Sequence, residues 1–328
     1  MANLNNKHKK RIGIIVPDTG PDLTNISIDP WDHLIFRQNE LRVDVLRLDK
    51  IHSEISGNKW FKLKYYFEKA KRASKNTLVS FGGAYSNHLL ALASMARMNG
   101  LHSVGLIRGE KPVTLSHTLT AAREYGMKLL FLPRTVFDLI KRSDHLDNWE
   151  EYFTDLSTEA IRDGLLIPEG GAGFEGIEGS EEILSFIPQQ TYTHLCTAVG
   201  TGATLAGLIN SSPPDLKITG ISILKGTRNL EPMDISWIRD PSKMANVQII
   251  HDYHFGGYAK HNALLTGFMN IIYTESGIPT DFVYTGKLIF AVISMAEMKF
   301  FPPGSRILVL HTGGLQGNRS LTPGLLRF

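Results

Sequence analysis

The chain has 328 residues, of which 42% are hydrophobic, so it can form either two domains or one large α/β domain with a sizeable core. Its 35 basic and 32 acidic residues leave a net charge of +3, which is too balanced to indicate nucleic-acid binding. The single cysteine, Cys196, excludes an intramolecular disulfide framework and fits a reducing compartment.

No apolar run approaches the length of a membrane span, so we expect no contact with a membrane. The basic residues 5–11 are expected to be a solvated arm. The apolar run that follows them, residues 12–16, is too short for the core of a signal peptide. The sequence therefore predicts a cytoplasmic protein.

The first notable element in chain order is an amphipathic helical pattern that opens after Gly57 and Asn58. It carries four lysines within eleven residues, namely Lys59, Lys62, Lys64 and Lys69. Lysines in such a run usually solvate the polar face of a helix. Spacing alone therefore does not show which of them, if any, takes part in chemistry.

Short apolar runs then alternate with longer helical patterns, which is typical of a parallel sheet with crossover helices. The first such unit has strands at 77–83, 102–109 and 128–133 and helices at 86–100 and 117–126. A glycine-rich passage at 165–176 predicts a domain crossover.

A second unit follows, with a strand, a glycine loop and a helix at 193–209, a strand at 217–224, a loop and helix at 281–298 and a strand at 306–314. Residues 211–214 and 229–247 are expected to be irregular. We therefore predict an α/β protein with two open, twisted parallel-sheet domains and a cleft between them. The smaller domain is expected at 60–167, and the larger one at 1–59 together with 168–328.

Several loops at predicted strand ends are candidates for ligand binding. One comprises Gly200, Thr201, Gly202, Ala203 and Thr204. Backbone N–H groups of such a loop, at the start of a helix, can bind a phosphate, although glycine also serves close helix–sheet packing. The loop lacks the spacing of a dinucleotide fingerprint and the lysine of a P-loop, which counts against a nucleotide-binding module.

The loop at residues 82–88 contains Ser86 and Asn87, which can either recognise a substrate or cap the following helix. From the residues alone, capping is the better interpretation. Two further loops lie at 284–287 and 311–314, and His311 by itself predicts a structural histidine. The histidines at 251, 254 and 261 have no accompanying carboxylate or thiol pattern, so we assign no metal site.

Taken together, these motifs resemble the pyridoxal-phosphate enzymes of the 1-aminocyclopropane-1-carboxylate deaminase and D-cysteine desulfhydrase group. The resemblance extends from about Leu46 to Gly317. It rests on five motifs in the expected order, which are GNKWFKLKYYFEKA, TLVSFGGAYSNHLLALASMA, GTGATLAG, DFVYTGK and LHTGG. It implies a tryptophan-synthase-β-like fold (fold type II), a bound pyridoxal 5'-phosphate between the domains, a small amino-acid substrate and a homodimer.

The resemblance also implies roles for individual residues. Lys59 matches the lysine that binds the cofactor covalently, and Lys62 matches a basic residue near its phosphate. Ser86 matches a hydroxyl close to the substrate, and Asn87 matches an asparagine on the ring hydroxyl of the cofactor. The loop from Gly200 to Thr204 matches the phosphate loop. Tyr284 matches a tyrosine beside the cofactor ring, and Tyr258 lies where the deaminase has a second active-site tyrosine.

The sequence departs from the deaminase pattern at three positions. Thr285 stands where the deaminase has a glutamate that keeps the pyridine nitrogen protonated, and the last loop offers Thr312. A hydroxyl protonates the ring poorly, and the desulfhydrase branch also has threonines at these places. Tyr85 replaces a common glutamine and is expected to reshape the substrate pocket.

These observations favour a lyase that acts on a small amino acid in the manner of D-cysteine desulfhydrase and releases a 2-oxo acid and ammonia. Ring-opening deamination of 1-aminocyclopropane-1-carboxylate is the alternative reaction. A catalytically silent pyridoxal-phosphate-binding protein is the non-enzymatic alternative.

Overall fold

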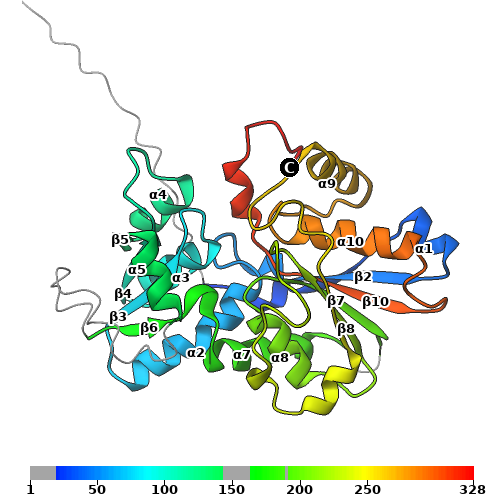
Figure 1. The fold of residues 1–328 in the computed structure, drawn as a ribbon, viewed down its shortest axis with the longest axis horizontal. Helices are drawn as coiled ribbons and strands as arrows, with labels where there is room; N and C mark the ends of the chain where they lie inside the picture. The colour runs from blue at the N-terminus through cyan, green and yellow to red at the C-terminus, as the bar shows by residue number, and fades with distance from the viewer. Residues whose placement is uncertain (1–19, 143–162, 189–190) are drawn as a thin grey trace, which may run out of the picture.

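The computed structural model describes residues 20–142, 163–188 and 191–328, and its strands form two separate sheets (Figure 1). The smaller sheet has four parallel strands in the order β5-β4-β3-β6. Their bounds are β3 (Thr77–Gly82), β4 (His102–Arg108), β5 (Lys128–Leu132) and β6 (Leu165–Ile167). Helices α3 (Asn87–Met98), α4 (His117–Glu124) and α5 (Arg134–Arg142) connect them.

The larger sheet has six strands in the order β1-β2-β10-β7-β8-β9. Their bounds are β1 (Ser27–Pro30), β2 (Arg42–Arg47), β7 (His194–Val199), β8 (Lys217–Ser222), β9 (Val247–Ile250) and β10 (Arg306–His311). All neighbours pair in parallel except β1, which pairs antiparallel with β2. The predicted parallel sheets are therefore observed, with one antiparallel strand, β1, added at an edge of the larger sheet.

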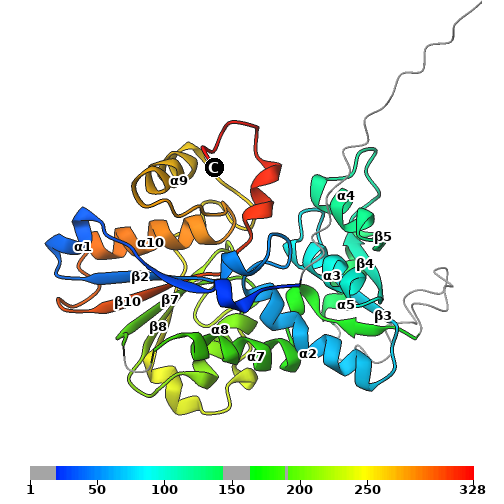
Figure 2. The same ribbon diagram turned by 180° about the vertical axis from the view of Figure 1, so that it is seen from behind.

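Helices cover both faces of the larger sheet, as the two opposite views show (Figures 1 and 2). Helices α1 (Leu34–Gln38), α9 (Ala263–Ser276) and α10 (Thr285–Glu297) lie on one side, and α7 (Phe174–Glu181) and α8 (Ala203–Ser211) lie on the other. Strand β10 shows why both sides need cover. Ile307 and Val309 enter the core under α10, while Leu308 and Leu310 enter the core under α8.

Helix α2 (Asn58–Arg72) lies between the two sheets and belongs to the packing of both (Figures 1 and 2). Its residues Leu63, Tyr66 and Phe67 join the core of the smaller sheet, whereas Phe61 joins a core of the larger one. Because α2 begins beside the loop after β10 and packs against both sheets, it brings groups of the two halves together.

The predicted α/β class is confirmed, and every strand and helix of the two predicted units is present. Residues 229–247 contain two short 3₁₀ helices, Ile235–Trp237 and Pro241–Asn246, within the stretch that we expected to be irregular. The expected domain boundaries at 60 and 167 stay a prediction. The basic residues 5–11 lie outside the described residues. None of the helices in the described ranges is both long and apolar enough to cross a membrane.

Candidate active site

The candidate site is built around the first turn of α2, which is tied to the loop after β10. Gly57 has a φ of +63°, and a Cβ at this position would lie 1.8 Å from the carbonyl oxygen of Thr312. Only glycine fits such a backbone approach without strain. The next residue, Asn58, donates its backbone N–H to the same carbonyl oxygen at 3.2 Å. The start of α2 is therefore fixed against Thr312.

Asn58 also links Lys59 to the helix that follows the glycine loop. The ammonium group of Lys59 donates to Asn58 Oδ1 at 2.9 Å, and Asn58 Nδ2 donates to Thr204 Oγ1 at 2.9 Å. Burial disfavours the charged form and lowers the pKa of Lys59 to about 8, although the nearby Asp281 carboxylate acts in the opposite direction. A substantial fraction of Lys59 is thus a neutral, nucleophilic amine near physiological pH.

Lys62 lies one helical turn further along α2 and points at the glycine loop. Its side chain is buried, and its Nζ lies 3.3 Å from Thr201 Oγ1. Burial, followed by the nearby charge of Lys59, lowers the pKa of Lys62 well below its usual value. No carboxylate within the described ranges pairs with this ammonium group. The arrangement therefore favours an anionic guest beside Lys62.

The glycine loop supplies the second element of an anion site. Gly202 has a φ of +87° and precedes α8, and a Cβ there would lie 2.6 Å from the Cα of Met233. The loop thus needs glycine for its conformation and its packing. The N-terminus of α8 carries backbone N–H groups without intrahelical partners and a partial positive charge. Together with the Lys62 amine, it makes this corner suited to an anion, whose negative charge would favour the protonated form of Lys62.

A second glycine stretch packs against Lys62, and no motif in the sequence predicted this position. Gly170 and Gly171 have φ values of +68° and +67°. A Cβ on Gly170 would lie 3.0 Å from Thr201 Cγ2, and one on Gly171 would lie 3.4 Å from Lys62 Cβ. The predicted domain crossover at 165–176 therefore also forms a wall of the candidate site.

Two tyrosines, Tyr284 and Tyr258, lie near Lys59. The Lys59 ammonium is 5.8 Å from the centre of the Tyr284 ring, and the Tyr258 ring meets Tyr284 edge-on at 6.1 Å. Burial, followed by the adjacent Tyr258, raises the pKa of Tyr284 well above its usual value, so its phenol stays protonated. Gly200 packs against this ring, since a Cβ there would lie 3.1 Å from Tyr284.

Asp281 organises the first turn of α10, and sequence reasoning missed it. Its buried carboxylate accepts hydrogen bonds from the backbone N–H groups of Val283, Tyr284 and Thr285 at 2.8–2.9 Å. The Thr285 hydroxyl donates to the same carboxylate at 2.8 Å and accepts from the Asp281 backbone N–H at 2.7 Å. The hydroxyl of Thr285 is therefore already engaged within its own turn.

Asn87 and Ser86 lie at the carboxyl end of β3 and start α3. Ser86 caps α3, because its hydroxyl accepts from the backbone N–H of Leu89 at 3.3 Å. Asn87 is buried, and its Oδ1 has no hydrogen-bond partner among the described residues. A Cβ on Gly314, in the loop after β10, would lie 3.2 Å from Asn87 Nδ2. Asn87, which follows strand β3 of the smaller sheet, therefore lies next to the loop that follows Thr312.

The structure accordingly brings most predicted site residues to one place, from the start of α2, the glycine loop, the start of α3, the start of α10 and the loop after β10. Thr285 is turned toward Asp281, and Ser86 serves as a cap. The other two lysines of α2 lie apart, since Lys64 pairs with Glu182 and Lys69 with Glu175. His311 is structural, with its Nε2 2.7 Å from the carbonyl oxygen of Pro279.

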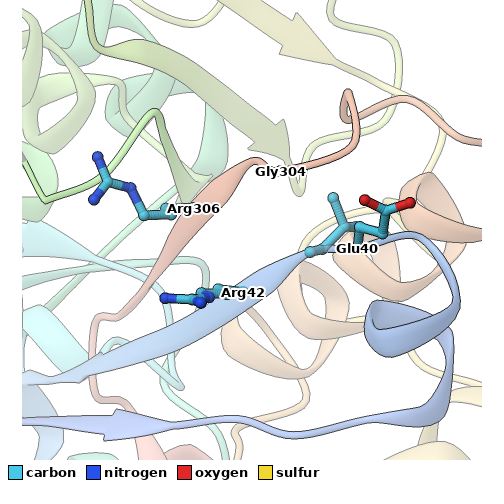
Figure 3. A pocket seen from close by; sticks show the side chains of 5 residues that line it. Glu40, Arg42, Gly304 and Arg306 are labelled. Carbon is cyan, nitrogen blue, oxygen red and sulfur yellow. The ribbon is translucent and has the colours of Figure 1, made fainter.

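A separate pocket of about 420 Å³ lies at the opposite end of β2 and β10 from the candidate site, where these two inner strands of the larger sheet begin (Figure 3). Arg42 and Arg306 extend from neighbouring strands there, and Glu40 lies beside them. None of the predicted site residues lines it. No cluster of potential metal ligands occurs in the part of the chain that the structure describes.

Known proteins were compared with the chain. No family model matches it. A protein of Pyrococcus horikoshii, provisionally named a 1-aminocyclopropane-1-carboxylate deaminase, is 26% identical over 309 residues, covering 89% of this chain and 92% of that protein. A D-cysteine desulfhydrase of Salmonella choleraesuis is 28% identical over 278 residues, covering 79% and 83%.

A solved structure described as an ACC deaminase homologue superposes on the chain with a TM-score of 0.71 at 23% identity and covers 90% of each chain. The resemblance predicted from the five motifs is thereby confirmed, and so is the predicted fold. The chain is similar over most of its length to proteins that are named as enzymes.

Proposed function

We propose that this relative of the 1-aminocyclopropane-1-carboxylate deaminases and D-cysteine desulfhydrases is a pyridoxal-phosphate-dependent lyase. It acts on a small amino acid and releases a 2-oxo acid and ammonia. The observation that carries the proposal is the pair of lysines in the first turns of α2, where Asn58 holds Lys59 and Lys62 contacts Thr201 of the glycine loop before α8. Burial lowers the pKa of Lys59 to about 8, and Lys62 has no carboxylate partner among the described residues.

The residues present fit pyridoxal phosphate. Its phosphate would be held by the backbone of Gly200 to Thr204, the Thr201 hydroxyl and Lys62. Asn87, with a buried and unpartnered Oδ1, would receive a polar group of the ring. Tyr284 would lie beside the ring, and Lys59 would attach the cofactor covalently.

When bound, this cofactor supplies the electron sink for reactions at the carbon that bears the amino group. The protein's own part is positioning and proton transfer. Asn58 holds the Lys59 amine at 2.9 Å, and the lowered pKa leaves that amine able to accept the α-proton of the substrate. The protonated phenol of Tyr284 and the hydroxyl of Ser86 are placed as hydrogen-bond donors for a substrate carboxylate or leaving group.

The environment of the two threonines supports elimination over ring opening. The Thr285 hydroxyl is engaged by Asp281, whereas the Thr312 hydroxyl has no hydrogen bond to another described residue. We therefore assign the contact with the pyridine nitrogen to Thr312. A neutral hydroxyl there leaves the ring less protonated than a carboxylate would. The reaction proposed is loss of a β-substituent, as expected for D-cysteine.

Ring-opening deamination of 1-aminocyclopropane-1-carboxylate is the second candidate. It is favoured by the similarity to the Pyrococcus horikoshii protein, which extends over 89% of this chain. The proposal further includes a cytoplasmic location, a homodimer and the division into a smaller domain at 60–167 and a larger one made of the remaining residues.

A substrate panel tests the proposal. The purified protein, supplied with pyridoxal phosphate, is incubated separately with D-cysteine, L-cysteine, D-serine and 1-aminocyclopropane-1-carboxylate, and ammonia and 2-oxo acid are measured. We expect release from D-cysteine and loss of that release in Lys59→Ala. Release from 1-aminocyclopropane-1-carboxylate alone would replace elimination by ring opening. Cofactor binding without release from any substrate would instead indicate the silent binding protein.

A further inference from the structure

A lysine outside α2 is also fully buried, and it has no part in the chemistry described above. Lys287 lies in the first turns of α10, three residues after Tyr284. Its ammonium group donates to the carbonyl oxygen of His254 at 2.9 Å and to that of Gly257 at 2.8 Å. A buried ammonium is retained at considerable cost, so a specific role is expected for these two contacts.

The segment that Lys287 holds has an unusual backbone. Phe255, Gly256, Gly257 and Ala259 have φ values of +51°, +93°, +116° and +53°. Left-handed conformations are unfavourable for non-glycine residues, costing about 1 kcal/mol each, so such a segment persists only where its surroundings hold it. Besides turn contacts within the segment, such as Gly257 N–H to His254 O at 3.0 Å, two groups of α10 hold it: the Phe290 ring, 4.9 Å from that of Phe255, and the Lys287 ammonium, which supplies the polar contacts.

The segment 254–259 contains Tyr258. The Tyr258 side chain is 45% exposed, yet its ring meets Tyr284, whose own ring lies beside Lys59. Tyr258 is thus in contact with the candidate site without being packed into the core. Its position depends on the backbone that leads into it, which Lys287 binds at His254 and Gly257.

We propose that Lys287 is a positioning residue that clamps the 254–257 backbone onto α10 and so places the Tyr258 ring at the site. This inference rests on the proposed function in so far as Tyr258 and Tyr284 face the substrate. The cation fits two convergent carbonyl oxygens better than any neutral side chain, because hydrogen bonds from charged donors are the stronger ones. Burial lowers the pKa of Lys287 to about 8, whereas the Asp281 carboxylate, just before the same helix, favours the charged form.

The chain offers a matched control. Lys243 also donates to two backbone carbonyl oxygens, those of Asn210 at 2.7 Å and Ser212 at 2.9 Å. These contacts join the 3₁₀ helix Pro241–Asn246 to the end of α8, away from Tyr258. Removing this ammonium therefore tests the general effect of losing a lysine clamp, without disturbing the proposed position of Tyr258.

The test compares Lys287→Met with Lys243→Met in the full chain with pyridoxal phosphate. Hydrogen exchange of peptides spanning 252–260 is measured together with kcat, KM and the cofactor absorption band. In Lys287→Met we expect exchange of this segment to be about tenfold faster or more, since each lost charged hydrogen bond is worth about 1.5–3 kcal/mol. In the same variant we expect kcat/KM to fall while the cofactor absorption band is kept. Lys243→Met should change neither the exchange at 252–260 nor kcat/KM.

Two further variants separate positioning from general damage. In a Tyr258→Phe background, Lys287→Met should cause little additional loss of kcat/KM, because both changes act through the same phenol. Lys287→Gln retains a hydrogen-bond donor on a shorter side chain, so we expect the same changes with a smaller magnitude. This variant serves as the test if Lys287→Met does not fold.

Unchanged exchange at 252–260, or losses of activity that multiply in the double variant, would overturn the proposal. If the wild-type protein instead showed no cofactor band, the proposed function would fail. The exchange experiment would still decide whether Lys287 clamps the segment.

Discussion

At the scale of single residues, contacts distinguish four lysines that look alike in the sequence. Lys64 and Lys69 pair with Glu182 and Glu175 on the outer side of α2. Lys59 and Lys62 point inward, toward Asn58 and Thr201, and each has a lowered pKa because of burial. The inward pair therefore has the properties expected of an imine-forming lysine and its phosphate-binding neighbour.

The pKa of Lys59 leads to a prediction for cofactor uptake. Because the free amine is the nucleophile and its pKa is about 8, the rate of covalent attachment should rise about tenfold from pH 7 to a plateau above pH 8. Stopped-flow absorbance of the cofactor-free protein mixed with pyridoxal phosphate measures this rate. The same reaction with N-acetyl-lysine methyl amide, whose amine titrates near 10.4, is the control. A rate that kept rising to pH 10 would contradict the assignment.

At the scale of elements, the site depends on three strand ends and the first turn of one helix. The loops after β3, β7 and β10 bring Asn87, Thr201 and Thr312 toward α2. Ligands of open α/β sheets bind at the carboxyl ends of strands. Gly57 is the critical point of contact, because the carbonyl oxygen of Thr312 occupies the space that a side chain would need.

Gly57→Ala should therefore be destabilising for two reasons. The φ of +63° disfavours alanine by about 1 kcal/mol, and the overlap with Thr312 adds about 1–3 kcal/mol. Gly100→Ala is the matched control, since Gly100 has a φ of +67° and no atom within 4 Å of the added Cβ. Urea unfolding of both variants measures the difference. Equal losses of stability in the two variants would show that Thr312 does not restrict position 57.

Much of this arrangement was predictable from sequence because local signals agree with the fold. Ser86 is a recognisable helix cap, and Gly200 and Gly202 mark a strand–loop–helix turn. Asn58 and Asp281 were missed for a physical reason. Asn58 acts through Thr204, which is 146 residues away, and Asp281 is a buried carboxylate whose partners are mainly backbone N–H groups. No periodicity or motif reports such contacts.

At the scale of the whole molecule, two sheets contribute to one site. The smaller sheet supplies Asn87, the larger one supplies Thr201, Thr312 and the start of α10, and α2 packs against both. A ligand bound at Lys62 and Asn87 would therefore link the two halves. Ligand binding to the folded state alone stabilises that state by mass action.

We accordingly predict that pyridoxal phosphate slows hydrogen exchange in both halves, at peptides covering the start of α3 and the start of α8. At about 100 times the dissociation constant, the stabilisation should be about 2.7 kcal/mol. Pyridoxal without its phosphate is the control ligand and should protect the α8 peptide less. Protection confined to the larger sheet would mean that Asn87 takes no part in binding.

The central claim is that Lys59 binds the cofactor covalently, and visible absorption tests it most directly. The purified protein with pyridoxal phosphate should show the absorption band of the lysine-bound cofactor, and Lys64→Ala, on the outer side of the same helix, should retain it. Lys59→Ala should lose the band while remaining folded by circular dichroism. An unchanged band in Lys59→Ala would contradict the account.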